Sequence, residues 1–167
     1  AHQMYRKYVV RDVPYVETPQ MKVGNDTHKA MELRVRGTRQ LPPALEHLER
    51  FARVFDGRSA LAEPELGITR KGRSTGFRDE NVWGRGKADA VIIQDTTAYL
   101  ADWKTGKVRE DPFELEVQAV LLRARFPQLT KIRGQFIWLK ENTLGPMYDL
   151  SDTQTAWGTI CHLVSLI

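Results

Sequence analysis

Two carboxylates and one amine lie on neighbouring segments that we expect to be strands. Asp89 lies in an apolar run, and the motif Asp-Trp-Lys-Thr-Gly-Lys starts at Asp102. Asp102 and Lys104 are two residues apart, so on a strand they share a face. If the connecting turn centres on Asp95–Thr96, Asp89 lies opposite Asp102; if the centre is one residue later, Asp89 lies opposite Lys104. In either register the three side chains converge in one patch.

This patch has the chemistry of a metal-dependent phosphate site. Carboxylate oxygens select hard divalent cations such as Mg²⁺ or Mn²⁺. The cation polarises a phosphate oxygen and lowers the pKa of a bound water, while Lys104 positions that water or stabilises the charge of the pentavalent phosphorane. The alternative is a surface salt bridge between Asp102 and Lys104, with Asp89 as a turn residue.

The same segments resemble a known nuclease family. A Gly-x-x-Asp that ends at Asp89, followed on the next strand by Asp-Trp-Lys-Thr-Gly-Lys, is similar to the RecB-type branch of the PD-(D/E)XK nuclease superfamily. That branch has a histidine in a Gly-x-x-x-His context near the domain start, which His28 matches. It also has a glutamine in the helix after the lysine strand, which Gln118 matches. The resemblance covers about residues 24–140.

The resemblance implies a role for each matched residue. The implied metal ligands are His28, Asp89, Asp102 and the backbone carbonyl of Trp103. Lys104 would be catalytic, and Gln118 would orient Lys104 or a DNA phosphate. Family members often carry tyrosine four residues after the glutamine. Leu122 stands there in this chain, a departure that concerns a phosphate or base contact rather than the metal. For a lone histidine such as His28, the alternative is an ordinary polar helix residue.

Hydrophobic periodicity and turn residues predict the elements that must position these groups. The first predicted helix covers about Asp26–Arg36 and is capped by Asn25, Asp26 or Thr27, and a second lies between Pro42 and Gly57. A third covers Pro112–Phe126, and its apolar face consists of Phe113, Val117, Val120, Leu121 and Ala124. The last helix opens with a capping box at Ser151 and runs to Ile167. The predicted strands are Ser59–Thr69, Gly86–Gln94, Ala98–Lys104, Lys131–Leu139 and Thr143–Leu150, with Arg70–Trp83 as a loop or long hairpin tip.

This order predicts an α/β fold, a mixed β-sheet flanked by helices. It matches the α-β-β-β-α-β order of the PD-(D/E)XK, or restriction-endonuclease-like, core that the resemblance implies. With 167 residues the chain is expected to form one domain. We expect an irregular N-terminal arm over residues 1–22, the core over residues 24–140 and a C-terminal strand and helix over residues 141–167.

The charge distribution favours a polyanionic partner. The chain has 25 lysines and arginines against 21 acids, a net charge of +4. Residues 141–167 contain three acids and neither lysine nor arginine, so residues 1–140 carry +7. Such an excess suits nucleic acid, and the alternative is a solvated basic surface. The basic clusters are Arg34/Arg36/Arg39, Arg70/Lys71/Arg73, Arg85/Lys87 and Lys104/Lys107/Arg109.

Cysteine usage and hydropathy set the expected compartment. The one cysteine, Cys161, excludes an internal disulfide and an iron–sulfur cluster built from this chain alone. No segment approaches the roughly 18 apolar residues of a membrane span, and Ala1–Val10 has no apolar signal-peptide region. We therefore expect no membrane partner and a cytoplasmic protein of a bacterial or phage-infected cell, with an organelle matrix as the alternative.

Four further residues near the predicted patch have two interpretations each. Glu63 and Glu65 share a strand face, and one of them could lie beside the metal as an outer carboxylate. Trp83 and Trp103 flank the patch and could stack on bases. Aromatic residues at strand ends more often pack in the core.

From the residues and the resemblance together, we expect a DNA nuclease that depends on Mg²⁺ or Mn²⁺ and hydrolyses phosphodiester bonds in DNA recombination, repair or processing. Exonuclease action is the expected mode, with a helicase or single-strand-binding protein as a partner in trans. The alternatives are a catalytically silent nucleic-acid-binding module on the same fold, and an unrelated small domain whose motif match is accidental.

Overall fold

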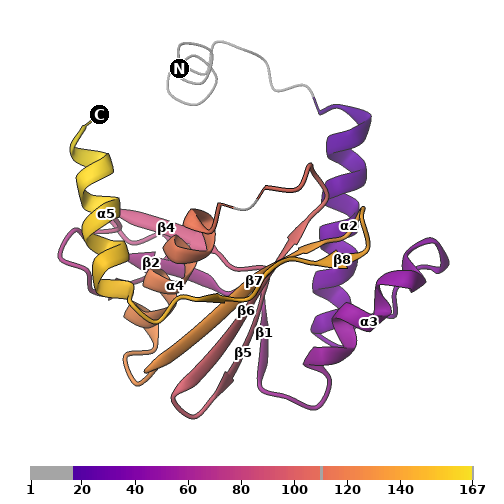
Figure 1. Cartoon of the computed structure of the whole chain (residues 1–167), viewed down its shortest axis with the longest axis horizontal. Coiled ribbons are helices and arrows are strands. Elements are labelled where there is room, and N and C mark those ends of the chain that lie inside the picture. The colour runs from indigo at the N-terminus through magenta and orange to yellow at the C-terminus, as the bar shows by residue number, and fades with distance from the viewer. Residues whose placement is uncertain (1–16, 110, 167) are drawn as a thin grey trace.

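The computed structural model of the chain describes residues 17–109 and 111–166. A central sheet separates α2 and α3 on one face from α4 and α5 on the other (Figure 1). The chain is therefore an α/β protein with a mixed sheet flanked by helices. The helices are α2 (Pro19–Val35), α3 (Glu49–Ala52), α4 (Phe113–Arg125) and α5 (Thr153–Ser165), and short 3₁₀ turns at η2 (Pro43–Leu48) and η3 (Arg53–Phe55) extend α3 on both sides.

The strands form a large and a small sheet. The large sheet has the order β1-β5-β6-β7-β8, with β9 also paired to β7, and the small sheet has the order β3-β2-β4. All neighbours are antiparallel except β6 and β7, which are parallel and joined through α4. The strands are β1 (Ala60–Ala62), β2 (Glu65–Ile68), β3 (Ser74–Thr75), β4 (Gly84–Lys87), β5 (Ala90–Gln94), β6 (Thr97–Lys104), β7 (Lys131–Trp138), β8 (Thr143–Leu144) and β9 (Tyr148–Asp149).

The register of β5 and β6 matches the first of the two predicted alternatives. Ala90 pairs with Ala101, and the turn centres on Asp95–Thr96. Asp95 has a φ of 53°, a left-handed conformation that aspartate tolerates in tight turns. One step beyond Ala90, this register places Asp89 level with Asp102.

Each of the two long strands predicted before β6 is broken in two. The predicted strand Ser59–Thr69 is β1 and β2, and the predicted strand Gly86–Gln94 lies within β4 and β5. Ala62 pairs with Ala90 in the large sheet, and Glu65 pairs with Lys87 in the small sheet. The two pairings have the same register, so it continues across the break between β1 and β2. The four strands are therefore one long hairpin, bent where it leaves the large sheet.

The first helix begins earlier than predicted. Its cap is Thr18, whose hydroxyl accepts a hydrogen bond from Met21 N at 3.2 Å, and Pro19 occupies the first turn. The predicted caps at residues 25–27 are wrong, since these residues lie inside α2. Gly37 follows the helix with a φ of 72°, as its predicted C′ position requires. Of the predicted arm, residues 19–22 belong to α2, and residues 1–16 lie outside the described residues.

Two apolar cores fill the spaces between the layers. One lies between the sheet and α4, with Leu115, Ala119 and Leu122 as the most buried helix residues. The predicted apolar face of this helix is rotated relative to the observed one, since Phe113 and Val117 are only partly buried. The other core lies between the sheet and α2, α3 and η3, and it includes Met31, Phe51 and Trp103 among its members. The strands carry apolar residues on both faces because helices cover both.

The C-terminal segment differs from its prediction in two details. The strand predicted over Thr143–Leu150 is the two short strands β8 and β9. The cap of α5 is Asp152, which accepts a hydrogen bond from Thr155 N at 3.0 Å, rather than Ser151. The Ser151 hydroxyl instead accepts from Ile132 N at 3.1 Å, so it ties this segment to β7.

Candidate active site

The bend in the long hairpin places Asp89 beside β6. At this point Glu63 has a φ of 48°, and Pro64 follows it without an N–H to donate to the partner strand. The last bond before the bend joins Glu63 N to Asp89 O at 3.0 Å. The Asp89 carboxylate then accepts a hydrogen bond from Trp103 N at 2.7 Å. The break that the sequence did not predict therefore anchors Asp89 to the next strand.

Asp102 and Lys104 share the face of β6 that α4 covers. Lys104 Nζ lies 2.6 Å from Asp102 Oδ2, so the predicted convergence of this pair is confirmed. Gln118 on α4 donates from Nε2 to Asp102 Oδ1 at 2.7 Å. Asp102 is only 3% exposed. Its carboxylate therefore contacts the Lys104 ammonium through Oδ2 and the Gln118 amide through Oδ1.

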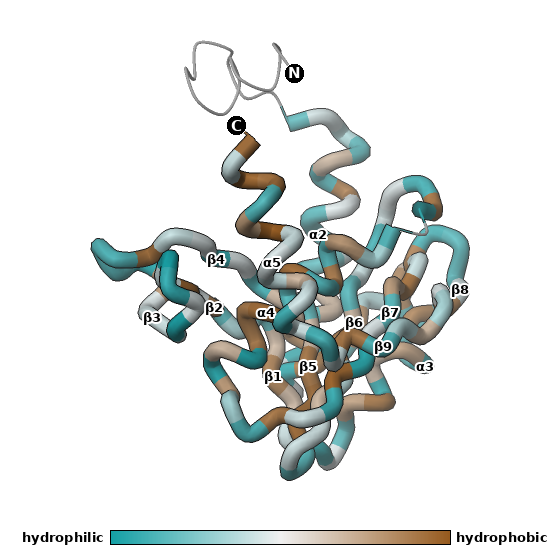
Figure 2. The backbone as a smooth tube through the Cα atoms, turned by 60° about the vertical axis from the view of Figure 1, so that its left-hand side comes forward, coloured by the Kyte–Doolittle hydropathy of each residue, from teal (hydrophilic) through white to brown (hydrophobic). Residues whose placement is uncertain are grey.

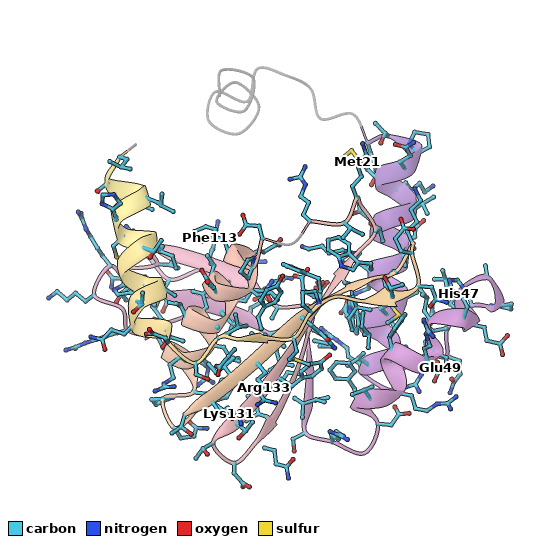
Figure 3. The ribbon with its side chains drawn as sticks, viewed as in Figure 1. Met21, His47, Glu49, Phe113, Lys131 and Arg133 are labelled. Carbon is cyan, nitrogen blue, oxygen red and sulfur yellow. The ribbon has the colours of Figure 1, made fainter. Side chains whose placement is uncertain are left out.

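Glu114 is a member of this cluster that the sequence reasoning missed. Its Oε2 atom lies 2.7 Å from Lys104 Nζ. Glu114 precedes Gln118 by four residues on α4, so the two side chains lie on the same helix face. Figure 3 labels Phe113, which marks the end of α4 that carries Glu114. The signal in the sequence was the helical spacing to Gln118.

His28 reaches the site from the opposite layer. Its Nδ1 atom lies 3.6 Å from Asp89 Oδ1, and its side chain is 31% exposed. Gly24 lies one turn earlier on α2, and a Cβ at this position would come 2.9 Å from Thr105 Oγ1. The glycine therefore lets α2 approach the end of β6 closely. This contact gives a physical reason for the spacing of Gly24 and His28 in the sequence.

The surroundings of the buried Asp102 carboxylate disfavour its ionised form. Burial, and then the charge of Asp89, raise the pKa of Asp102 to about 6, although Lys104 opposes the shift. Burial lowers the pKa of Lys104, but Asp102 and Glu114 outweigh it, so the pKa of this ammonium is raised. Burial also lowers the pKa of His28, and the hydrogen bond and charge of Asp89 outweigh it to give a raised pKa. The two carboxylates thus repel each other and favour any added cation.

The pKa of Asp102 leads to a stability prediction. It is higher in the folded chain than in the unfolded chain, so between pH 4 and 7 the folded state binds more protons and stability falls as the pH rises. We expect wild-type protein without metal to lose up to about 3 kcal/mol over this range relative to Asp102→Asn. Urea denaturation of both proteins in EDTA at several pH values measures the difference. If the free energies of unfolding of the two proteins change in parallel with pH, the pKa of Asp102 is not raised in the folded chain.

The side chains of the site are of the kinds that bind a hard divalent cation, but they are not arranged as a complete set of metal ligands. Asp89 and Asp102 offer carboxylate oxygens and His28 an imidazole, which are ligands that Mn²⁺ and Mg²⁺ accept. Among residues 17–109 and 111–166, however, no group of three or more His, Cys, Asp or Glu side chains is arranged as a metal-binding cluster. The Oε1 atom of Gln118 is buried and has no hydrogen-bond partner in this part of the chain.

The other candidate residues have structural roles. Trp103 is 1% exposed and meets Phe55 edge to face at 5.8 Å, so its ring is not available to bases. Trp83 meets Trp157 edge to face at 5.2 Å. Glu63 and Glu65 each lie 3.4 Å from the ammonium of Lys87. The interpretation as a packing residue is confirmed for Trp103, and Trp83 packs partly buried against the core beside α4.

One predicted basic cluster is partly neutralised. Arg34 is 8% exposed and forms ion pairs with Glu49 and Asp56. Their carboxylates accept its hydrogen bonds and raise the pKa of Arg34 above its usual value. Glu49 extends from α3 beside α2 (Figure 3). Arg34 therefore joins α2 to the α3 segment and is not a contact for a polyanion.

Because Arg34 joins two helical segments and is not a contact for a polyanion, we expect its loss to lower the stability of the fold and to leave DNA binding unchanged. Replacing Arg34 with glutamine leaves Glu49 and Asp56 without their shared cation, so we expect a clear fall in melting temperature. The exposed Arg39 on the following loop is the matched control, and Arg39→Gln is expected to leave the melting temperature nearly unchanged. Thermal denaturation compares the two. Equal melting temperatures would show that the Arg34 ion pairs do not stabilise the fold.

Comparisons with known proteins do not assign a family. No family model matches the chain, and no curated protein matches it. Among solved structures, one described as "Crystal structure of SSO0001" aligns with a TM-score of 0.42 and 16% sequence identity, covering 99% of this chain and 84% of that chain. None of the helices among the described residues has the length and apolar character that a membrane span requires.

Proposed function

We propose that the chain is a divalent-metal-dependent DNA nuclease with a RecB-type PD-(D/E)XK site. The observation that carries the proposal is the connected cluster of His28, Asp89, Asp102, Lys104 and Gln118. These residues come from α2, the hairpin bend, β6 and α4, and α2 is separated in the sequence from the other three (Figure 1). A buried acid beside a second acid and a lysine is a costly arrangement for a protein that only needs a stable fold.

Each residue has a definite task in this proposal. Asp89, Asp102 and His28 would hold Mg²⁺ or Mn²⁺, with the Trp103 carbonyl as a further ligand. When bound, the metal supplies Lewis-acid activation of the phosphate and of water. Gln118 fixes the orientation of the Asp102 carboxylate through its 2.7 Å hydrogen bond. Lys104 keeps its proton, because its pKa is raised, and stabilises negative charge on the reacting phosphate.

A catalytically silent nucleic-acid-binding module is the second candidate. The ion pairs of Lys104 with Asp102 and Glu114 favour it, since they give two of the carboxylates a cation from the protein itself. In that case Lys104 and its partners would only stabilise the fold. The two candidates differ in whether DNA is cut.

The test is cleavage of labelled DNA in defined metals. End-labelled linear and closed circular DNA, single- and double-stranded, is incubated with Mg²⁺, Mn²⁺ or EDTA. We expect cleavage with Mg²⁺ or Mn²⁺ and none with EDTA. Stepwise loss from linear DNA with intact circles would identify an exonuclease. Binding without cleavage in either metal would favour the silent module, and equal cleavage in EDTA would exclude the proposed chemistry.

A further inference from the structure

A basic pocket lies on α4, away from the acidic site. It has a volume of about 530 Å³ and lies between α4, the start of α5 and the turn that joins β2 to β3. Arg123 reaches it from α4, about one and a half turns beyond Gln118. Lys71 and Arg73 line it from the turn. The pocket therefore shares a helix with the candidate active site but not its residues.

The turn that carries two of these cations is held in place. Thr69 N donates to Arg73 O at 2.8 Å, and Gly72 N donates to Thr69 O at 2.9 Å. Gly72 has a φ of 75°, and a Cβ there would come within 3.6 Å of the Trp157 ring, so the turn lies against α5. The two loops that end the small sheet are mainly hydrophilic (Figure 2). Lys71 and Arg73 are thus exposed side chains on an ordered support.

Arg123 has an unsatisfied donor. Its Nη1 atom is buried, and it has no hydrogen-bond partner in residues 17–109 and 111–166. A buried guanidinium N–H without an acceptor costs free energy. A nearby arginine, Arg125, is exposed and extends over the ring of Phe126 at 5.4 Å. The two arginines of the same helix therefore have different surroundings.

The lining of the pocket has one sign of charge. Its charged residues are Lys71, Arg73 and Arg123, and no aspartate or glutamate lines it. Ser74, Thr153 and Gln154 add neutral polar groups. The nearest acid in the sequence, Asp152, is turned to the helix backbone, where it caps Thr155 N at 3.0 Å. Three cations with hydroxyl and amide neighbours and no acid match a phosphate group.

We infer that this pocket is a phosphate-binding site, separate from the acidic cluster. Its ligand is a phosphate group, either of a nucleic-acid backbone or of a free phosphate. The Arg123 guanidinium donates to a phosphate oxygen, while Lys71 and Arg73 balance the remaining charge from the rim. If the phosphate belongs to DNA, the inference rests on the proposed function, and the pocket holds the strand at a second point along α4.

Inorganic phosphate tests the site without DNA and without cleavage. Calorimetry with phosphate in metal-free protein is expected to show binding that Arg123→Gln weakens about tenfold or more, the loss of one charge-assisted hydrogen bond. Lys71→Gln/Arg73→Gln changes only exposed residues and provides a second variant should Arg123→Gln not fold. Arg125→Gln removes the same charge from the same helix outside the pocket and is the control.

DNA binding in EDTA identifies the source of the phosphate. Anisotropy of a labelled single-stranded oligonucleotide is measured as a function of salt, where each lost phosphate contact reduces the slope of log K against log salt by about 0.7. Pocket variants that reduce this slope, with an unchanged slope for Arg125→Gln, support a backbone phosphate. Weakened binding of inorganic phosphate with an unchanged DNA slope supports a free phosphate. If the pocket variants match Arg125→Gln in both measurements, the site does not exist.

The two proposals fail separately. Both binding measurements are made in EDTA, so they do not depend on whether the acidic cluster cleaves DNA. A protein that never cuts DNA in Mn²⁺ but loses phosphate affinity in Arg123→Gln would keep the phosphate site and lose the nuclease.

Discussion

Lys104→Ala is expected to cleave DNA about 10²–10³ times more slowly than the wild type while it still binds Mn²⁺ and DNA. The physical reason is that Lys104 is not a metal ligand: its ammonium lies 2.6 Å from Asp102 Oδ2 and supplies positive charge at the site. That charge matters most when negative charge develops on the phosphate, so the loss falls on kcat. Single-turnover kinetics at saturating Mn²⁺ measures it.

Lys131→Ala is the matched control for this prediction. Lys131 is an exposed lysine at the start of β7, paired with Thr97 at the opposite end of β6 from Lys104, and the same substitution removes the same charge. We expect its cleavage rate to stay within a few-fold of the wild type. If Lys104→Ala cleaves as fast as Lys131→Ala, Lys104 has no catalytic role.

Asp102→Ala is expected to lose Mn²⁺ binding and DNA cleavage together. Asp102 provides the buried carboxylate of the proposed metal site, and its neighbour Asp89 and the imidazole of His28 are too few to replace it. DNA affinity in EDTA should be kept, because the exposed lysines and arginines that we expect to contact phosphates are unchanged. Calorimetry with Mn²⁺ at pH 7.5, where the wild-type carboxylate is ionised, measures the first loss.

Asp26→Ala serves as the control for the loss of metal binding. Asp26 is exposed on α2, two residues before His28, so the substitution removes one carboxylate from the same region without touching the cluster. Normal Mn²⁺ binding is expected for this variant. If Asp102→Ala also binds Mn²⁺ normally, Asp102 is not a ligand of the metal, and the proposed metal site is wrong.

The parts of the fold with strong local signals were predictable. The β6 strand and α4 have the predicted limits within one residue, because apolar periodicity and Pro127 define them. The pairing of Asp102 with Lys104 follows from their spacing of two on a strand. The choice between the two registers was not predictable, because it depends on a left-handed φ at Asp95 that only the folded turn shows.

Other features depended on contacts that a sequence pattern does not contain. The capping residues Asn25, Asp26 and Thr27 suggested a helix start near residue 26, whereas Thr18 and Pro19 supply the real start. Gly24 is tolerated inside the helix because α2 must approach Thr105 there. Arg34 looked like part of a basic cluster, yet Glu49, brought close by the tertiary fold, neutralises it.

The bend of the hairpin was also hidden in the sequence. Glu63 and Pro64 interrupt the strand, but an interruption alone does not tell where the chain resumes its pairing. The continued register from Ala62 to Glu65 shows that the pairing partner stays the same. The bend therefore changes the direction of the strands and leaves Asp89 at the junction, where it accepts from Trp103 N.

The most direct test of the central claim is the rate at which purified protein releases label from linear DNA in Mn²⁺, measured beside Asp102→Asn purified in the same way. A contaminating nuclease would be present in both preparations, so only a difference between them counts. We expect cleavage by the wild type in Mn²⁺, none after addition of EDTA, and none by Asp102→Asn in either condition. Equal cleavage by the two proteins, or none by the folded wild type, would contradict a metal-dependent nuclease site at Asp89, Asp102 and Lys104.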